Sequence, residues 1–281
     1  MKKLILSLCV MIVFAAPAQA GAEEGGAYER MQQTAKLRCG YALWDPALIK
    51  DPETGEMTGA FVEFMNALGK ATGLEIEWTQ ETDWGQVPEA LKTGKIDAMC
   101  ASMWPSSKKA RVMAFSDPVY YNVVEAYVRE GHEKLAGKSL ADLNDENITI
   151  AVIDNDIADE IADFDFPKAQ KLSAPTLVTD AHLLMDVATG KADVTFTSEA
   201  IAIGFRENNP GKIVRFVPAH PVRVFENTIG VDIHEYELLQ VLNAATAELL
   251  NSGVVDRILD RYEKDYPGSF RRVSKPYEAS K

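Results

Sequence analysis

Hydrophobic and polar positions in the first part of the chain follow two different periods. Short apolar runs typical of strands occur at residues 37–43 (LRCGYAL), 74–80 (LEIEWTQ) and 95–102 (KIDAMCAS). Spacing typical of amphipathic helices occurs at residues 61–73 (FVEFMNALGKATG) and 87–94 (VPEALKTG). Strands that alternate with helices of this length predict a parallel sheet built from βαβ units.

A second series of elements repeats this order. The pattern predicts strands at 148–154 (ITIAVID) and 191–198 (KADVTFTS), and helices over 156–164, over 180–190 and from Glu199. Two α/β units of similar design in one chain predict two lobes. The groove between such lobes is a favoured place for a small ligand.

The two units also share a sequence motif. TGKIDAMC begins at Thr93 and TGKADVTF begins at Thr189, and Ser102 and Ser198 occupy equivalent positions after them. A Gly-Lys turn before a strand is common, so the motif alone is equally compatible with a duplicated sheet unit without a site. With a groove present, the motif would bring one serine hydroxyl to it from each lobe.

The first twenty residues have the features of a secretory signal peptide. MKK is followed by the apolar stretch LILSLCVMIVFAA and by small residues before a predicted cleavage after Ala20. A membrane anchor is the alternative, although the apolar stretch is short for a span. Cys9 lies inside that stretch, which disfavours a lipoprotein signal. We expect an exported, periplasmic protein with a polar leader at 21–36 that has little to bury, and a tail at 276–281.

Charge excludes several classes of partner. The chain has 29 Lys and Arg against 42 Asp and Glu, and loss of Lys2 and Lys3 with the signal peptide would increase the acidic excess. A protein of this charge is not expected to bind nucleic acid or anionic lipid. We also expect no insertion of the mature chain into a membrane.

Several segments, in order, resemble the periplasmic solute-binding proteins of polar amino acid ABC importers, which are bacterial extracellular solute-binding proteins of family 3 with the type II periplasmic binding protein fold. These segments are LRCGYALWDP, PETGEMTGAFVEFMNALGKATG, ALKTGKIDAMCASM, FSDPVYY, GKSLADLNDENITIAVID and ELLQVLNAATAELLNSGVVDRILDRYEKDY. The resemblance covers about residues 37–266.

The resemblance implies two α/β lobes, each a mostly parallel sheet flanked by helices, that close on a solute. Lobe 1 would comprise residues 37–121 and 227–275, and lobe 2 residues 125–222, with two chain crossings near 121–124 and 222–227. Closure would remove the solute from water and strengthen each polar contact to it. The implied partners are a small-molecule solute and an inner-membrane ABC permease, and the protein would be a monomer.

Aromatic residues are expected in the groove because an aromatic side chain near the first strand stacks on the solute in similar proteins. Tyr41 and Trp44 follow that strand, and Trp104 follows the third. A position in the core of the lobe is the alternative for Trp44. Trp84 either faces the groove or packs inward at the start of a helix.

The resemblance also locates the positions that hold an amino acid ligand. In similar proteins a Thr and an Arg, before the Phe of FSDP, bind the α-carboxylate; here these positions are Ser106 and Lys109. A lysine lacks the bidentate fork of arginine. The alternative is that Lys109 belongs to a solvated helix face with Lys108 and Arg111.

The second lobe departs further from the family. Asp156 occupies the position of a carboxylate-binding Thr, with Asp154 nearby, although Asp is also a good helix N-cap. The ammonium-binding Asp is replaced by Ser198, with Glu199 beside it. We therefore expect a small polar ligand that is not a standard α-amino acid held in the usual way. It would have at most one anionic group near Ser106 and Lys109, and a donor-rich or cationic part would face Asp154, Asp156 or Glu199.

Cys39 and Cys100 are the cysteines that remain beyond the signal peptide. They lie near the ends of the first and third predicted strands, which are neighbours in the implied fold, and an oxidising compartment would permit a disulfide. Bridges between adjacent parallel strands are uncommon, so a bridge and two free thiols both stay open.

The sequence shows no pattern for a metal, a cofactor or a catalytic motif. Its histidines have no ligand spacing, and it lacks a P-loop, a nucleophile elbow and a Rossmann glycine pattern. These histidines are His132, His182, His220 and His234. We expect a binding protein and not an enzyme. One alternative is a cyclohexadienyl dehydratase-like enzyme with Glu199 or Asp156 as its acid; another is a ligand-sensing partner of a chemoreceptor or sensor kinase.

Overall fold

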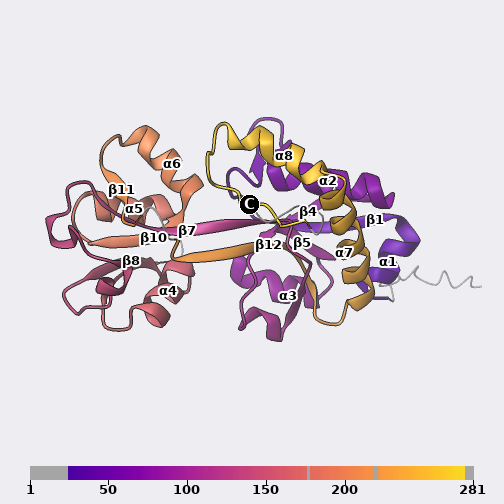
Figure 1. Ribbon diagram of the computed structural model, residues 1–281. Coiled ribbons are helices and arrows are strands. Elements are labelled where there is room, and N and C mark those ends of the chain that lie inside the picture. The colour runs from indigo at the N-terminus through magenta and orange to yellow at the C-terminus, as the bar shows by residue number, and fades with distance from the viewer. Residues whose placement is uncertain (1–24, 176–177, 218–220, 276–281) are drawn as a thin grey trace, which may run out of the picture.

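The computed structural model describes residues 25–175, 178–217 and 221–275, and in this part of the chain one sheet runs through two lobes (Figure 1). The first lobe contributes β1 (Lys36–Tyr41), β4 (Glu75–Glu81), β5 (Ala98–Met103) and β6 (Met113–Phe115). The second contributes β8 (Thr149–Ile153), β9 (Gln170–Ala174), β10 (Val194–Ser198) and β11 (Ile213–Arg215). The long strands β7 (Tyr120–Arg129) and β12 (Arg223–Asp232) extend from one lobe into the other.

The strand order is β4-β1-β5-β12-β7-β10-β8-β9, with β6 on β12 and β11 on β7. Strand β1 pairs in parallel with β4 and β5, and β8 pairs in parallel with β9 and β10. A separate small hairpin joins β2 (Ile49–Lys50) to β3 (Met57–Thr58). The crossing strands pair antiparallel over Tyr120–Val124 and Arg223–Asn227.

Helices flank the sheet in both lobes. The first lobe has α1 (Ala27–Thr34), α2 (Ala60–Thr72), α3 (Val87–Lys92), α7 (Tyr236–Asn251) and α8 (Val254–Glu263). The second has α4 (Ile157–Asp165), α5 (Asp180–Ala188) and α6 (Glu199–Asn208). This architecture confirms the two-lobed α/β class that the sequence predicts.

Each lobe has its own hydrophobic core. The first core contains the fully buried Phe61 and Met99, and draws its residues from 27–120 and 229–270. The second contains Tyr127 and Phe196, with residues from 124–213. The chain therefore passes twice between two separately packed bodies, through β7 and β12.

Helix α2 shows how the sequence spacing produces packing. Its buried side chains include Phe61, Phe64, Met65 and Leu68, which lie on one face of a helix with 3.6 residues per turn. The helix ends at Gly73, whose φ of 74° is the left-handed conformation that glycine adopts most easily. Truncation of Leu68 to Ala in this setting would cost about 2–5 kcal/mol of stability.

The repeated motif fixes the register of one strand in each lobe. The backbone N–H of Asp97 donates to the carbonyl of Arg38 at 2.8 Å, and its carboxylate accepts from the Arg38 N–H at 3.0 Å. Asp193 makes the same pair of contacts with Thr149, at 2.8 and 2.9 Å. Each Asp thus aligns its strand with the start of a parallel neighbour, β1 or β8. We call this arrangement the strand clamp.

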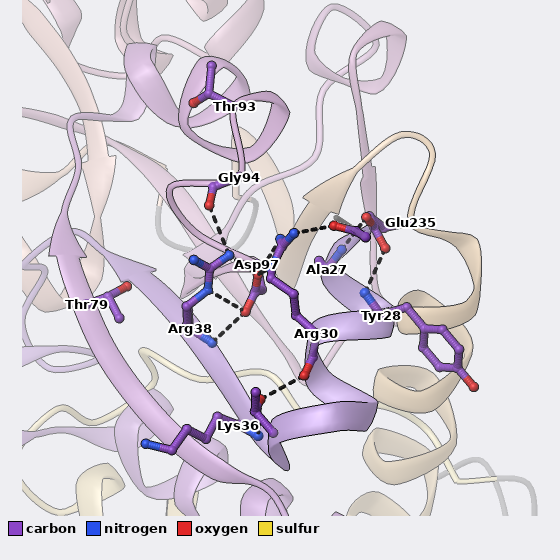
Figure 2. A network of polar contacts seen from close by, with 12 residues as sticks. Ala27, Tyr28, Arg30, Lys36, Arg38, Thr79, Thr93, Gly94, Asp97 and Glu235 are labelled. Atoms are coloured by element: carbon purple, nitrogen blue, oxygen red, sulfur yellow. Dashed lines mark hydrogen bonds and ion pairs between the residues drawn. The ribbon is translucent and has the colours of Figure 1, made fainter. Parts of the chain in front are cut away.

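The Asp carboxylate of each strand clamp also lies beside two basic side chains. Figure 2 shows the guanidinium groups of Arg30 and Arg38 around the Asp97 carboxylate. Their distances from it are 2.8 and 2.6 Å. Burial acts to raise the pKa of Asp97, but the hydrogen bonds from these arginines hold it below its usual value. In the second lobe, Lys134 and His132 lie 2.8 and 3.1 Å from the Asp193 carboxylate.

Part of the expected polar leader is a packed helix, which corrects the expectation that it buries little. Ala27 and Met31 of α1 are 5% and 2% exposed and belong to the first core. The Glu235 carboxylate accepts hydrogen bonds from the N–H groups of Ala27 and Tyr28 at 2.6 and 3.0 Å (Figure 2). A distant carboxylate therefore satisfies the first N–H groups of α1, which a helix cannot satisfy itself.

Cys39 on β1 and Cys100 on β5 form a disulfide, with their Cα atoms 5.5 Å apart. The bridge links two neighbouring strands inside the first core, and it resolves the alternative that the sequence leaves open. The predicted signal peptide at 1–20 and the predicted tail at 276–281 lie outside the described residues. Within the described ranges, no helix combines the length and apolar character needed to span a bilayer.

Candidate ligand-binding site

The second lobe presents helix N-termini at the ends of its strands. Helix α4 follows β8 and is capped by Asp156, whose carboxylate accepts from the N–H of Ile157 at 2.7 Å. Helix α6 follows β10 and is capped by Ser198, whose hydroxyl lies 3.5 Å from the N–H of Ile201. Both residues that the resemblance placed at the ligand therefore also have a capping role. Asp154, just before α4, is exposed.

Asp180 adds a carboxylate at this edge of the second lobe. It is the first residue of α5, and its Oδ2 accepts from the Thr197 hydroxyl at 2.6 Å. Burial and the negative charge of Asp156 raise the pKa of Asp180 to about 6, while the hydrogen bond from Thr197 acts to lower it. Sequence reasoning missed this residue, because an Asp at a helix start carries no distinguishing signal.

Lys109 brings a positive charge of the first lobe close to the second. It is half-buried in the short 3-10 helix η2 (Lys109–Arg111), and its N–H donates to the Ser106 hydroxyl at 3.3 Å. Burial lowers the pKa of Lys109, and the negative charges of Glu160 and Asp156 act to raise it. Its neighbours Lys108 and Arg111 are exposed. Lys109 thus differs from the solvated face to which those two belong.

Trp104 lies between an aromatic side chain of the first lobe and one of the crossing strand β12. Its ring meets Trp44 edge to face at 5.5 Å between centroids, and it stacks on Phe225 at 4.5 Å with an interplanar angle of 5°. Trp44 packs against the first core, whereas Trp104 and Phe225 pack against the second. The structure therefore brings Trp44 and Trp104 together, as a series of rings that connects the lobes.

Ser102 is enclosed rather than open to solvent. It is 2% exposed, and its hydroxyl donates to Asn227 Oδ1 at 2.6 Å and lies 3.0 Å from the Tyr120 hydroxyl. The Trp104 indole N–H donates to the same Asn227 oxygen at 2.9 Å. Sequence reasoning missed Asn227, which lies in no recognisable motif.

Two of the expected aromatic residues have other surroundings. Tyr41 is 6% exposed, packs edge to face with Trp78, and has its hydroxyl 3.0 Å from the Lys50 ammonium. Trp84 is 41% exposed in the 3-10 helix η1 (Trp84–Gln86) before α3. Neither ring is in the series formed by Trp44, Trp104 and Phe225.

Glu199 is engaged inside its own lobe. Its carboxylate accepts from the Tyr127 hydroxyl at 2.5 Å and lies 2.5 and 2.8 Å from the guanidinium groups of Arg206 and Arg215. Burial acts to raise the pKa of Glu199, but these hydrogen bonds keep it below its usual value. A carboxylate held in this way is poorly suited to donate a proton, so it is a weak candidate for the acid of a dehydratase.

In the described part of the chain, no group of three or more His, Cys, Asp and Glu side chains is arranged to hold a metal ion. His132 is paired with Asp193, and His182 lies 3.4 Å from Asp186. His220 lies outside the described residues.

Curated relatives of this chain are binding proteins of bacterial origin. The L-arginine-binding protein of Pseudomonas aeruginosa is 26% identical over 231 residues, which cover 79% of this chain and 85% of the relative. A probable histidine-binding protein of Neisseria gonorrhoeae is 23% identical, with 74% of this chain and 75% of the relative covered.

Solved structures share the fold. A putative ABC transporter binding component of Wolinella succinogenes, complexed with lysine, matches with a TM-score of 0.69 at 22% identity, covering 87% of this chain and 98% of the other. An ancestral amino acid-binding protein, a precursor of cyclohexadienyl dehydratase, matches with a TM-score of 0.68 at 24% identity, covering 86% and 100%.

The family model for bacterial extracellular solute-binding proteins, family 3, matches residues 37–265. This match spans both lobes and both crossing strands. The chain therefore belongs to the bacterial extracellular solute-binding proteins of family 3.

Proposed function

We propose that this protein is the periplasmic solute-binding component of an ABC importer and captures a small, amino-acid-like solute by closure of its lobes. Family membership, the two-lobed fold and the names of the relatives support this proposal. The protein would work as a monomer that delivers its solute to an inner-membrane permease, after removal of the signal peptide. Lobe 1 (37–121 and 227–275) and lobe 2 (125–222) would be the moving bodies.

The solute would contact side chains from both lobes. The first lobe would offer the rings of Trp44 and Trp104 and the polar groups of Ser106 and Lys109. The second would offer Asp154, Asp156 and Ser198. Ser102 and Tyr41 would shape the wall of the site, because their hydroxyls already have partners.

The surroundings of Lys109 carry the proposal on the ligand. Lys109 stands where similar proteins bind a carboxylate, yet Asp156 and Glu160 of the other lobe are close enough for their charges to act on it. A ligand carboxylate at this position would have to compete with those acidic side chains. We therefore propose that the ligand is not a standard α-amino acid held in the usual way, and that it has at most one anionic group near Ser106 and Lys109.

Thermal unfolding in the presence of a compound panel tests this proposal. A ligand at 100 times its dissociation constant stabilises the folded state by about 2.7 kcal/mol. For a chain of this size, that corresponds to a rise in Tm of roughly 5–10 °C. The panel would compare the standard amino acids with amines, aromatic acids and heterocycles.

Lys109→Ala and the matched exposed control Lys108→Ala would be measured beside the wild type. We expect a shift of this size only with compounds outside the standard amino acids. If an ordinary amino acid gives this shift, and the shift is lost in Lys109→Ala but kept in Lys108→Ala, the ligand is held in the usual way and this part of the proposal is wrong.

A further inference from the structure

Asn227 occupies the junction between the crossing strands and the candidate ligand-binding site. Its side chain is completely buried on β12, opposite Tyr120 of β7. Its Oδ1 accepts from the Ser102 hydroxyl at 2.6 Å and from the Trp104 indole N–H at 2.9 Å. One amide oxygen thus binds two side chains at the end of β5: Ser102, within the strand, and Trp104, directly after it.

The orientation of the amide follows from its partners. An indole N–H can only donate, so the Asn227 atom that faces Trp104 must be the oxygen. The Nδ2 group then points to the carbonyls of Tyr120 and Phe225, at 3.3 and 3.5 Å. Both ends of the amide are therefore used. A side chain without an acceptor oxygen would leave the part-buried Trp104 N–H without this partner, whereas the Ser102 hydroxyl would keep the Tyr120 hydroxyl beside it.

Strand β12 holds the Trp104 ring by its edge and by its face. Residues two apart on a strand point to the same side, so Phe225 and Asn227 act together. Phe225 stacks on the face of the indole at 4.5 Å, while Asn227 binds its N–H. Because Trp104 comes from the first lobe and packs against the second core, this arrangement fixes a contact between the lobes.

Ser102 adds local strain to the same junction. Its φ of 59° lies in the left-handed region, which is unfavourable for a residue other than glycine. Its hydrogen bonds to Asn227 and Tyr120 hold it in that conformation. The direction in which the chain leaves β5 towards Trp104 thus also depends on β12.

We propose that Asn227 is a positioning residue that holds Trp104 in the orientation in which its ring links the two lobes, and so couples the crossing strands to the ligand-binding site. The inference rests on the proposed function in treating Trp104 as a residue of that site. It makes a claim about Trp104 itself that can be measured without a ligand.

The indole N–H resonances of the four tryptophans provide the first test. In Asn227→Ala, we expect the Trp104 resonance to move and its proton to exchange faster with water, while the resonances of Trp78 and Trp84 stay in place. The Trp44 resonance should move with that of Trp104, because the two rings are in contact. Asn227→Asp retains acceptor oxygens and should restore most of the protection. The matched control is Asn122→Ala, which removes a buried asparagine of β7 that bonds to the carbonyl of Ser269 instead.

An unchanged Trp104 resonance in Asn227→Ala, or an equal change in Asn122→Ala, would overturn the inference. If Asn227→Ala does not fold, Asn227→Asp and the wild type decide it. The Trp104 proton should then be the slowest of the four to exchange in the wild type and in Asn227→Asp, and fast exchange in the wild type would contradict the proposal.

The distance between the lobes provides the second test. Spin labels on Phe164→Cys in α4 and Tyr236→Cys in α7 occupy exposed positions, 81% and 65% exposed, one in each lobe. We expect Asn227→Ala to broaden the distance distribution of the ligand-free protein, because Trp104 no longer fixes the contact. The control Asn243→Ala removes an amide of α7 that bonds to Asp117 within the first lobe, and should not broaden it.

Identical distributions for Asn227→Ala and the unsubstituted labelled protein would refute the coupling. Both tests use ligand-free protein, so their failure leaves the proposed function standing. Conversely, if no compound of the panel stabilised the protein, the proposed function would be contradicted. A change of the Trp104 indole resonance in Asn227→Ala would still support the role of Asn227.

Discussion

Asp180 illustrates how burial and neighbouring charge act on a single side chain at the candidate site. Its pKa is raised to about 6 by burial and by Asp156. A carboxyl group whose pKa is higher in the folded than in the unfolded protein binds its proton more tightly when folded. Its contribution to stability is therefore present below the unfolded pKa of about 3.9 and is lost as the pH rises through about 6.

We predict that the free energy of unfolding of Asp180→Asn, relative to that of the wild type, is higher at pH 7.5 than at pH 4.5. Asparagine keeps an acceptor for the Thr197 hydroxyl and cannot ionise, so it avoids the burial of a charge. Urea unfolding of ligand-free protein at the two pH values measures the difference. A constant difference between Asp180→Asn and the wild type would contradict the prediction.

Asp159 on α4 is a control of opposite sign. Burial acts to raise its pKa, but the hydrogen bonds from Lys171 and from the N–H of Asn155 leave it lowered. Its stabilising effect is therefore present above the unfolded pKa and is lost as the pH falls through the folded pKa. Asp159→Asn should be less stable than the wild type at pH 7.5, with a smaller loss at lower pH.

Residues of the candidate site could be proposed from the sequence only where a motif fixes their positions, and these proposals stay predictions. Ser106, Lys109 and Asp156 follow from spacing along one segment each. Asn227 binds Ser102 across 125 residues of sequence, so no local pattern could reveal the contact. The partners of Glu199 likewise come from separate elements. From the sequence, Glu199 could be a free acid at the site, but in the structure its carboxylate is paired with Tyr127 and Arg215.

At the scale of elements, the strand clamps differ in how deeply they are buried. The Asp97 side chain is 1% exposed between two arginines, whereas that of Asp193 is 16% exposed beside a half-exposed Lys134. Removal of one partner from a buried ion pair leaves an uncompensated charge. The two clamps therefore have the same geometry, but we expect the loss of Asp97 to cost more stability than the loss of Asp193.

We predict that Asp97→Ala lowers the free energy of unfolding by about 3–5 kcal/mol. Asp193→Ala should lower it less, by about 1–3 kcal/mol, because its lysine can return to water. Urea unfolding of the two variants under one set of conditions makes the comparison. Equal losses, or a larger loss for Asp193→Ala, would show that burial does not set the difference.

Helix α1 should depend on Glu235 for its first turn. We predict that Glu235→Ala costs about 0.5–2 kcal/mol, the range of a lost N-terminal cap. Amide hydrogen exchange should accelerate over residues 27–34 and stay unchanged in α2. The control is Glu237→Ala, which removes an exposed acidic residue in the first turn of α7, two positions after Glu235. Equal exchange in both variants would mean that the cap does not hold α1.

Most elements could be predicted because their apolar spacing is regular, as in α2 and in the two repeated units. Helix α1 could not, because few of its residues are apolar and its cap lies 208 residues away from Ala27. The disulfide was undecided for a different reason. The resemblance placed Cys39 and Cys100 on neighbouring strands, but bridges between adjacent parallel strands are uncommon, and only the structure shows that their Cα atoms lie 5.5 Å apart.

At the scale of the whole molecule, two separately packed lobes share one sheet through β7 and β12. Such a connection allows the lobes to rotate about the crossing strands while each core stays intact. The series of rings through Trp104 and the charges around Lys109 are the contacts that such a rotation would change. Capture by lobe closure therefore requires a solute that alters the arrangement of the lobes.

Small-angle X-ray scattering of the mature protein, with and without the compound that gives the largest thermal shift, tests this most directly. We predict that the radius of gyration falls when the compound saturates the wild type, because the lobes close on it. A stabilising compound that leaves the radius of gyration unchanged would contradict capture by lobe closure.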